Sequence, residues 1–154
     1  MSSERSVVHA TFSVERVFAA PLQRVFAAWA DPAEKARWFV PPPEWAAAEH
    51  ALDFRVGGTE HLTVTPPDGV ANVYGASYID IVADSRIVLV YTMHVGGAKI
   101  SASLATLEFF AEGESTRLVF TEQAAFLDGL DDPETRAAGT EQLMDGLARA
   151  LETA

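Results

Sequence analysis

The sequence predicts an α+β fold, a curved antiparallel sheet of six to seven strands around a long C-terminal helix, with two short helices after the first strand. Val7–Phe18 alternates between two kinds of side chain and is rich in β-branched and aromatic residues, as in a strand. The stretch Glu49–Gln123 has no helical period, whereas Leu143, Leu147 and Leu151 recur at i, i+4 and i+8. Because an apolar sheet face must be covered, and only the last helix is long enough, we expect the sheet to wrap around that helix.

Two short helices are expected between the first strand and the rest of the sheet. Pro21 suits a first helical turn, and one apolar stripe follows at i, i+3, i+4 and i+7, formed by Leu22, Val25, Phe26 and Trp29. Asp31-Pro32 ends this helix and begins the next, since aspartate caps helices and proline fits their first position. The second helix carries Trp38 and Phe39 and must stop before Pro41-Pro42-Pro43.

Six further strands are separated by short turns rich in glycine, proline and aspartate, which favours antiparallel hairpins. The strand-like runs are His50–Arg55, Thr59–Thr65, Val70–Val82, Arg86–His94, Ile100–Phe110 and Thr116–Ala124. A looser segment, Leu127–Glu134, leads into an amphipathic helix over Thr135–Leu151. The sequence has no repeat, linker or low-complexity segment, so we expect one domain over residues 1–154.

Composition excludes several classes of function. The chain has 154 residues, 49% of them hydrophobic, and a formal net charge of −11. Such acidity argues against binding nucleic acid or an anionic membrane surface. The sequence contains no cysteine, which rules out disulfides, thiolate nucleophiles and cysteine-based zinc sites. No secretory leader and no apolar run of about 20 residues is visible, so we expect a cytoplasmic protein.

Several segments together carry a family resemblance: Arg16–Pro21, Val25–Pro32, Ala36–Phe39, Asp53–Gly58, Tyr74-Gly75 with Tyr78, and Gly113–Leu118. They resemble the SRPBCC (START-like) superfamily, and within it the branch named after the activator of heat-shock-protein ATPase, often labelled polyketide-cyclase-like. The resemblance spans residues 8–152. It implies a helix-grip, or birch-pollen-allergen-like, fold that encloses an apolar ligand cavity.

The resemblance also bears on the last helix and on function. Members of this branch commonly have tryptophan after the glycine that enters that helix, whereas Gly139 is followed here by Thr140. A smaller residue there is expected to change how the helix docks and to enlarge the cavity. The superfamily includes ligand carriers, cyclases and co-chaperone domains, so the fold alone does not fix the function.

Strand parity suggests two carboxylates inside the cavity. Glu122 shares its parity with Leu118 and Phe120, and Glu60 shares its parity with Leu62 and Val64. A carboxylate on the inner face can act as a general acid or base, or hold a polar atom of a ligand. The alternative is that each reaches solvent or pairs with a cation at a strand end or edge.

Other candidates for ligand contact are aromatic or apolar: Trp38, Phe39, Tyr74, Tyr78, Tyr91, Phe126, Met144 and Leu147. Tyrosine rings can line a cavity while their hydroxyls bind a ligand oxygen, although core packing alone also explains them. His94 ends a strand near Tyr91 and is a candidate for the cavity rim. We expect no metal site, because His9, His50, His61 and His94 lack the spacing of metal ligands, and we expect no cofactor.

Three functions are compatible with these residues. The first is binding of a small hydrophobic or aromatic molecule by a carrier or sensor. The second is a cyclase or lyase acting on a polyketide-like or aromatic substrate, with Glu60 or Glu122 as acid or base. The third is an interaction module resembling a co-chaperone. A homodimer is also plausible, formed through exposed sheet edges and the region of Trp38 and Phe39.

Overall fold

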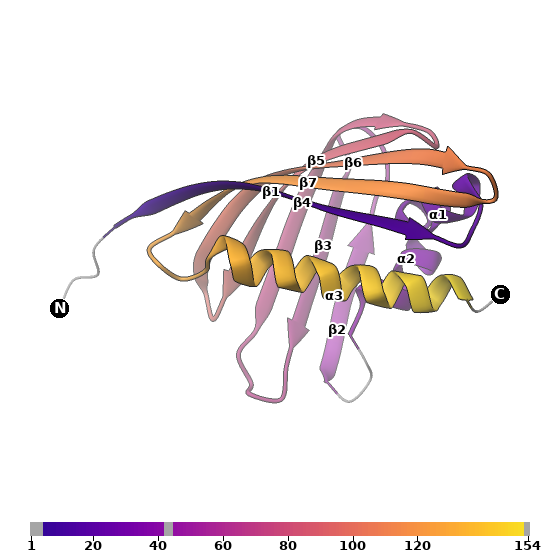
Figure 1. Ribbon diagram of the computed structural model, residues 1–154. Coiled ribbons are helices and arrows are strands. Elements are labelled where there is room, and N and C mark those ends of the chain that lie inside the picture. The colour runs from indigo at the N-terminus through magenta and orange to yellow at the C-terminus, as the bar shows by residue number, and fades with distance from the viewer. Residues whose placement is uncertain (1–4, 42–44, 153–154) are drawn as a thin grey trace.

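A computed structural model describes residues 5–41 and 45–152 (Figure 1). The elements are β1 (Val7–Phe18), α1 (Leu22–Ala30), α2 (Pro32–Phe39), β2 (Ala46–Leu52), β3 (Thr59–Thr65), β4 (Asn72–Val82), β5 (Arg86–Val95), β6 (Ala98–Glu112), β7 (Ser115–Leu127) and α3 (Pro133–Glu152). The seven strands form one antiparallel sheet in the order β1-β7-β6-β5-β4-β3-β2. This is the helix-grip fold that the sequence predicts.

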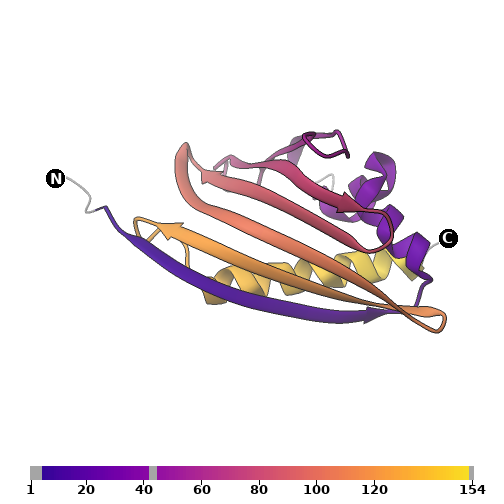
Figure 2. The same ribbon diagram turned by 90° about the horizontal axis from the view of Figure 1, so that it is seen from above.

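The sheet is strongly curved, and α3 runs beneath its concave face (Figure 1). Seen from above, α1 and α2 sit together at one end of the sheet, near the C-terminal end of α3 (Figure 2). Along its length α3 contacts β1, α1 and α2. The edge strands are β1 and β2. None of the helices in the described part of the chain is long and apolar enough to cross a membrane.

The junction of α1 and α2 is fixed by local hydrogen bonds. The Asp31 carboxylate accepts hydrogen bonds from the backbone N–H groups of Ala33 and Glu34, which caps α2 as the sequence predicts. The indole N–H of Trp38 donates to the carbonyl of Ala28, 3.0 Å away. The rings of Trp29 and Trp38 meet edge to face, with centroids 4.6 Å apart. The two helices therefore form one rigid corner.

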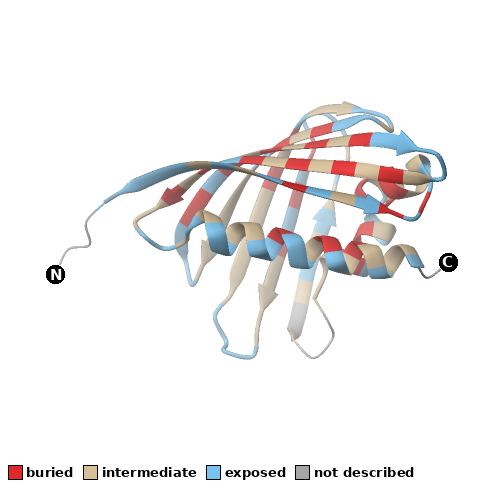
Figure 3. Cartoon of the chain, viewed as in Figure 1, coloured by how far each residue is buried: buried red, intermediate tan, exposed pale blue. Residues whose placement is uncertain are grey.

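Burial alternates along the central strands, as expected for a sheet with one covered face (Figure 3). In β7, the buried positions include Thr116, Leu118, Phe120, Glu122, Ala124 and Phe126. The hydrophobic core lies where the sheet meets α1, α2 and the C-terminal half of α3, and includes Phe18, Val25, Phe26, Leu107, Phe109, Leu118, Met144 and Leu147.

Five of the six strands after α2 differ from their predicted bounds, and two of them, β2 and β7, differ by three residues or more at an end. The predicted strand His50–Arg55 is β2, which ends at Leu52 because the chain then turns, with the Arg55 N–H donating to Asp53 and the Gly58 N–H to Arg55. In the same turn, the Gly57 N–H donates to Tyr78 and the Tyr78 N–H donates to Gly58, which pins Tyr78. Strand β7 continues past the predicted end at Ala124 to Leu127. Of the three prolines expected to end α2, Pro42 and Pro43 lie outside the described residues.

Candidate functional site

A cavity of about 430 Å³ lies between the concave face of the sheet and α3. Apolar side chains from β3 to β7 supply most of the sheet wall, among them Leu62, Ile87, Leu89, Met93, Val95, Ile100, Leu107 and Phe120. One face of α3 closes the cavity with Arg136, Gly139, Thr140 and Leu143, and the helical corner adds Trp29, Lys35 and Phe39. The polar groups at the wall include three tyrosines, Tyr74, Tyr78 and Tyr91.

Glu60 lies behind this wall at the centre of one buried cluster. Its Oε1 accepts hydrogen bonds from Lys35 Nζ and from the Tyr78 hydroxyl, both at 2.7 Å, and a longer one from the Tyr74 hydroxyl at 3.5 Å. Its Oε2 lies 2.8 Å from His50 Nε2. The side chain of Glu60 is 0% exposed and that of Lys35 is 3% exposed, so this is an ion pair removed from solvent.

In this cluster, Lys35 and Glu60 each favour the charged form of the other. Burial alone raises the pKa of Glu60, but the charge of Lys35 and the hydrogen bonds from His50, Lys35 and Tyr78 outweigh it and lower the pKa overall. Burial lowers the pKa of Lys35, and Glu60 offsets part of that effect. Burial, followed by the charge of Glu60, raises the pKa of Tyr78, so its hydroxyl stays protonated and donates.

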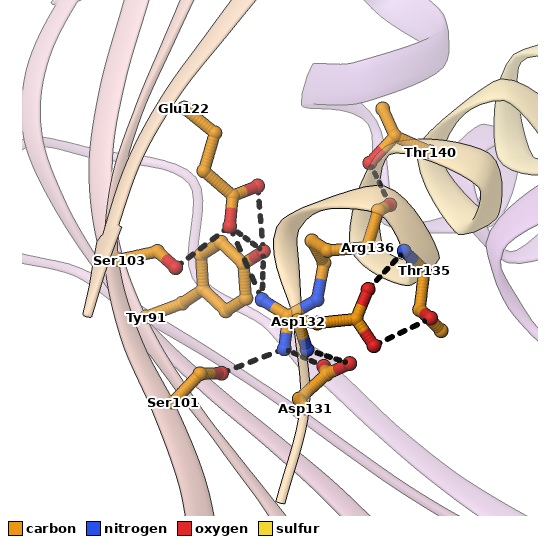
Figure 4. A network of polar contacts seen from close by, with 9 residues as sticks. All are labelled: Tyr91, Ser101, Ser103, Glu122, Asp131, Asp132, Thr135, Arg136 and Thr140. Carbon is orange, nitrogen blue, oxygen red and sulfur yellow. Dashed lines mark hydrogen bonds and ion pairs between the residues drawn. The ribbon is translucent and has the colours of Figure 1, made fainter. Parts of the chain in front are cut away.

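Glu122 forms a second buried cluster, drawn in Figure 4. Its carboxylate accepts hydrogen bonds from the Tyr91 hydroxyl at 2.7 and 2.8 Å and from the Ser103 hydroxyl at 2.7 Å. Arg136 Nη1 lies 3.1 Å from Glu122 Oε2 and 2.9 Å from the Tyr91 oxygen. Burial, followed by the charge of Glu122, raises the pKa of Tyr91.

The second terminal nitrogen of Arg136, Nη2, extends this second cluster to the start of α3. Arg136 Nη2 donates to Asp131 at 2.8 Å and to the Ser101 hydroxyl at 2.7 Å (Figure 4). Asp132 accepts from the N–H and the hydroxyl of Thr135, which caps the first turn of α3. The side chain of Glu122 is 0% exposed and that of Arg136 is 11% exposed. Arg136 therefore ties α3 to the sheet.

Strand register explains why a glutamate fits at each of the two places. Glu60 stands opposite Ala76 on β4, and Glu122 stands opposite Ala105 on β6. The small alanine leaves room for the carboxylate, and the neighbours two residues along the opposite strand reach it diagonally. For Glu60 these neighbours are Tyr74 and Tyr78, while for Glu122 one of them is Ser103.

Both cations were missed as candidates in the sequence, although helical periodicity holds a signal for each. Lys35, Trp38 and Phe39 are spaced at i, i+3 and i+4 and share one face of α2. Arg136, Thr140 and Leu143 have the corresponding spacing, i, i+4 and i+7, in α3. A charged residue within an apolar helical stripe indicates a buried partner, since an unpaired buried charge is costly.

Four of the predicted contact residues line the cavity: Phe39, Tyr74, Tyr78 and Tyr91. Glu60 and Glu122 are on the inner face, as strand parity predicts. Neither is among the described residues that line the cavity. The tyrosines and the cation that bond to each carboxylate do line the cavity.

The remaining five predicted contact residues lie elsewhere. Trp38 is buried in the helical corner, and Met144 and Leu147 pack in the core. Phe126 lies in β7, with its ring centre 5.4 Å from the Arg136 guanidinium carbon. His94 has the opposite parity to Tyr91 and Met93, which both line the cavity, so it faces away from it.

Comparison with known proteins gives consistent results. A family model described as "Activator of Hsp90 ATPase homolog 1-like protein" matches residues 19–152. No curated protein matches the chain. A putative uncharacterized protein from Rhizobium leguminosarum is 47% identical, with a TM-score of 0.94 over 99% of this chain and 100% of its own. The Mll3558 protein from Rhizobium loti is 43% identical, with a TM-score of 0.88 over 95% of this chain and 99% of its own.

A more distant structure shares the fold alone. The AHSA1-like protein from Aeromonas hydrophila is 19% identical, with a TM-score of 0.68 over 93% of this chain and 92% of its own. The family model covers most of the chain, and the observed helix-grip fold agrees with the resemblance found in the sequence. The chain therefore belongs to the activator of Hsp90 ATPase homolog 1-like family of the SRPBCC superfamily.

Proposed function

We propose that this protein binds a small, neutral, largely aromatic molecule in the cavity between the sheet and α3, as a carrier or sensor. The observation that carries the proposal is the cavity itself. Its volume of about 430 Å³ lies within the range of roughly 300–1,000 Å³ that is usual for small-molecule sites. Its wall is mainly aliphatic and aromatic, with a few polar groups that can orient a ligand.

The charges of the site support a neutral ligand. Lys35 is already paired with Glu60, and Arg136 is already paired with Glu122 and Asp131. A charged ligand would have to lose its hydration without gaining an unpaired partner in the cavity, which is unfavourable. An apolar or aromatic ligand, in contrast, gains from burial against this wall.

The arrangement of the two glutamates favours binding over acid–base catalysis. A catalytic acid or base must come within hydrogen-bond reach of the reacting proton, directly or through one water. Glu60 and Glu122 each accept several short hydrogen bonds, and neither is among the described residues that line the cavity. Both carboxylates are better placed to hold the tyrosine hydroxyls and cations in position.

A screen of small aromatic and aliphatic compounds by thermal shift and native mass spectrometry tests the proposal. At about 100 times its dissociation constant, a ligand of this cavity should stabilise the fold by about 2.7 kcal/mol. Thr140→Trp puts a large side chain into the cavity wall and should abolish the shift. Gln142→Trp, on an exposed position of the same helix, is the matched control and should retain it.

Each variant must first show cooperative unfolding and a normal circular dichroism spectrum, so that loss of binding is not loss of fold. Failure of every compound to stabilise the wild type would count against the proposal. Equal shifts in the wild type and in folded Thr140→Trp would place the binding site outside this cavity.

A further inference from the structure

The two buried clusters differ in their balance of hydrogen-bond donors and acceptors. At Glu60, a single oxygen, Oε1, faces Lys35 and Tyr78 at 2.7 Å and also Tyr74 at 3.5 Å. A carboxylate oxygen offers about two lone-pair sites. The two short bonds fill them, and His50 occupies the other oxygen at 2.8 Å. The Tyr74 hydroxyl therefore holds a long, weak bond that it can exchange for a better one.

Lys35 has a surplus donor as well. An ammonium group has three N–H donors, and those of Lys35 reach Glu60 at 2.7 Å and Tyr78 at 3.4 Å. No third acceptor for Lys35 occurs in the described part of the chain; instead Nζ lies 4.4 Å from the centre of the Phe39 ring. Lys35, Phe39 and Tyr74 all line the cavity.

A further unused donor lies beside them. The indole N–H of Trp29 is buried and has no hydrogen-bond partner among residues 5–41 and 45–152. The Trp29 ring lines the cavity, and its centre is 5.5 Å from Lys35 Nζ. An unsatisfied buried donor is unfavourable, so this corner of the cavity is short of hydrogen-bond acceptors.

In the cluster at Arg136, the N–H groups of both terminal guanidinium nitrogens are engaged. Nη1 donates to Glu122 and Tyr91, and Nη2 donates to Asp131 and Ser101, all within 3.1 Å (Figure 4). The Tyr91 hydroxyl donates to Glu122 at 2.7 and 2.8 Å, so it is fully engaged, unlike that of Tyr74. The two clusters thus differ: Tyr74 and Lys35 keep spare donor capacity at the cavity, whereas the Tyr91 hydroxyl and the terminal nitrogens of Arg136 are engaged.

We propose that the Tyr74–Lys35 corner binds an uncharged hydrogen-bond acceptor of the ligand, the carbonyl oxygen of an aryl ketone or quinone. The inference rests on the proposed function and specifies its ligand. The carbonyl accepts from the Tyr74 hydroxyl and from the third N–H of Lys35. A carboxylate is disfavoured in the same place, because Lys35 is already neutralised and a second anion would lie close to buried Glu60.

Three probes of nearly equal size and shape test this: acetylnaphthalene, isopropenylnaphthalene and naphthoate. They present a ketone oxygen, a hydrocarbon in its place, and a carboxylate. In the wild type, the ketone should bind about 10-fold more tightly than the hydrocarbon, which is the effect of one or two hydrogen bonds. Dissociation constants are measured by isothermal titration calorimetry.

Tyr74→Phe and Ser103→Ala serve as the test variant and its control, since each removes one hydroxyl that donates to a buried glutamate. In Tyr74→Phe the preference for ketone over hydrocarbon should fall to about twofold or less, while the hydrocarbon affinity changes little. In Ser103→Ala the lost hydroxyl donates to Glu122, and Ser103 is not among the described residues that line the cavity, so the preference should persist. Thermal unfolding confirms that both variants are folded.

The outcomes separate this inference from the proposed function. Equal binding of ketone and hydrocarbon by the wild type overturns the inference and leaves the aromatic-binding function standing. Tightest binding of naphthoate, or a ketone preference that survives in Tyr74→Phe, also overturns it. If none of the three probes binds, the proposed function fails and the inference fails with it.

Discussion

The rings of Tyr74 and Tyr91 are in contact, with centroids 5.1 Å apart and planes inclined by 42°. Tyr74 donates to Glu60 and Tyr91 donates to Glu122, so this contact joins the two buried clusters across one cavity wall. A ligand that displaces one ring therefore disturbs the hydrogen bonds of both carboxylates. The stability of the fold and the shape of the cavity depend on the same side chains.

Replacing Arg136 with methionine should strongly destabilise the protein. The change leaves Glu122 buried without its cation, and breaking a buried pair in this way costs about 3–5 kcal/mol. Urea denaturation measures the loss. Arg86→Met breaks an exposed pair with Asp80 and should cost less than about 1 kcal/mol. Similar losses for both variants would show that burial of the Arg136 cluster contributes nothing.

The Glu60 cluster should make stability depend on acid pH. Folding lowers the pKa of Glu60 from its usual value of 4.5, so its contribution is fully present above that pH and is lost as the pH falls through the lower, folded pKa. The difference in unfolding free energy between wild type and Glu60→Gln should be constant above about pH 5 and shrink below it. Glu114→Gln, at an exposed turn, should give a difference close to zero throughout. A difference that grows towards acid pH would contradict the lowered pKa.

Gly58→Ala should destabilise the fold and displace Tyr78. A Cβ at Gly58 would overlap the carbonyl oxygen of Asp53, and the backbone around it is hydrogen-bonded to Tyr78 on both sides. We expect a loss of about 2 kcal/mol or more by thermal unfolding. Gly75→Ala is the control, because the nearest atom to its Cβ is 3.9 Å away and the loss should be under about 1 kcal/mol.

Gly139→Ala should stabilise the protein. The residue lies inside α3, and a Cβ there meets nothing within 4 Å, so the substitution gains helix propensity without a clash. The expected gain is about 0.5–1 kcal/mol in chemical denaturation. Ala138→Gly, the reverse change at the exposed neighbouring position, should lose a similar amount. A loss of stability in Gly139→Ala would mean that α3 packs closer to the sheet than described.

Local patterns in the sequence predict the fold and the carboxylate at the centre of each buried cluster. Strand parity alone places Glu60 and Glu122 on the inner face, because a side-chain period of two leaves no other choice beside Leu62 and Phe120. Parity also places the His94 side chain on the face away from the cavity, although nearby Tyr91 faces into it.

The partners of the carboxylates could not be predicted in the same way. Lys35 is 25 residues from Glu60, and Arg136 lies across a loop from Glu122, so the pairing depends on how α2 and α3 dock on the sheet. The length of β7 was also underestimated, because Ala124 and Ala125 lack the β-branched and aromatic character that marked the rest of the strand. Docking and strand extension are set by tertiary contacts that local periodicity does not encode.

The edge-to-face pair of Trp29 and Trp38 has a practical consequence for spectroscopy. Trp29 lines the cavity, has a cation 5.5 Å from its ring centre, and is one of only three tryptophans in the chain. Indole emission responds to nearby charge and to the polarity of its surroundings. The fluorescence of Trp29 can therefore report ligand binding at the cavity wall without an added label. A Trp29→Phe variant gives the background emission of the other tryptophans.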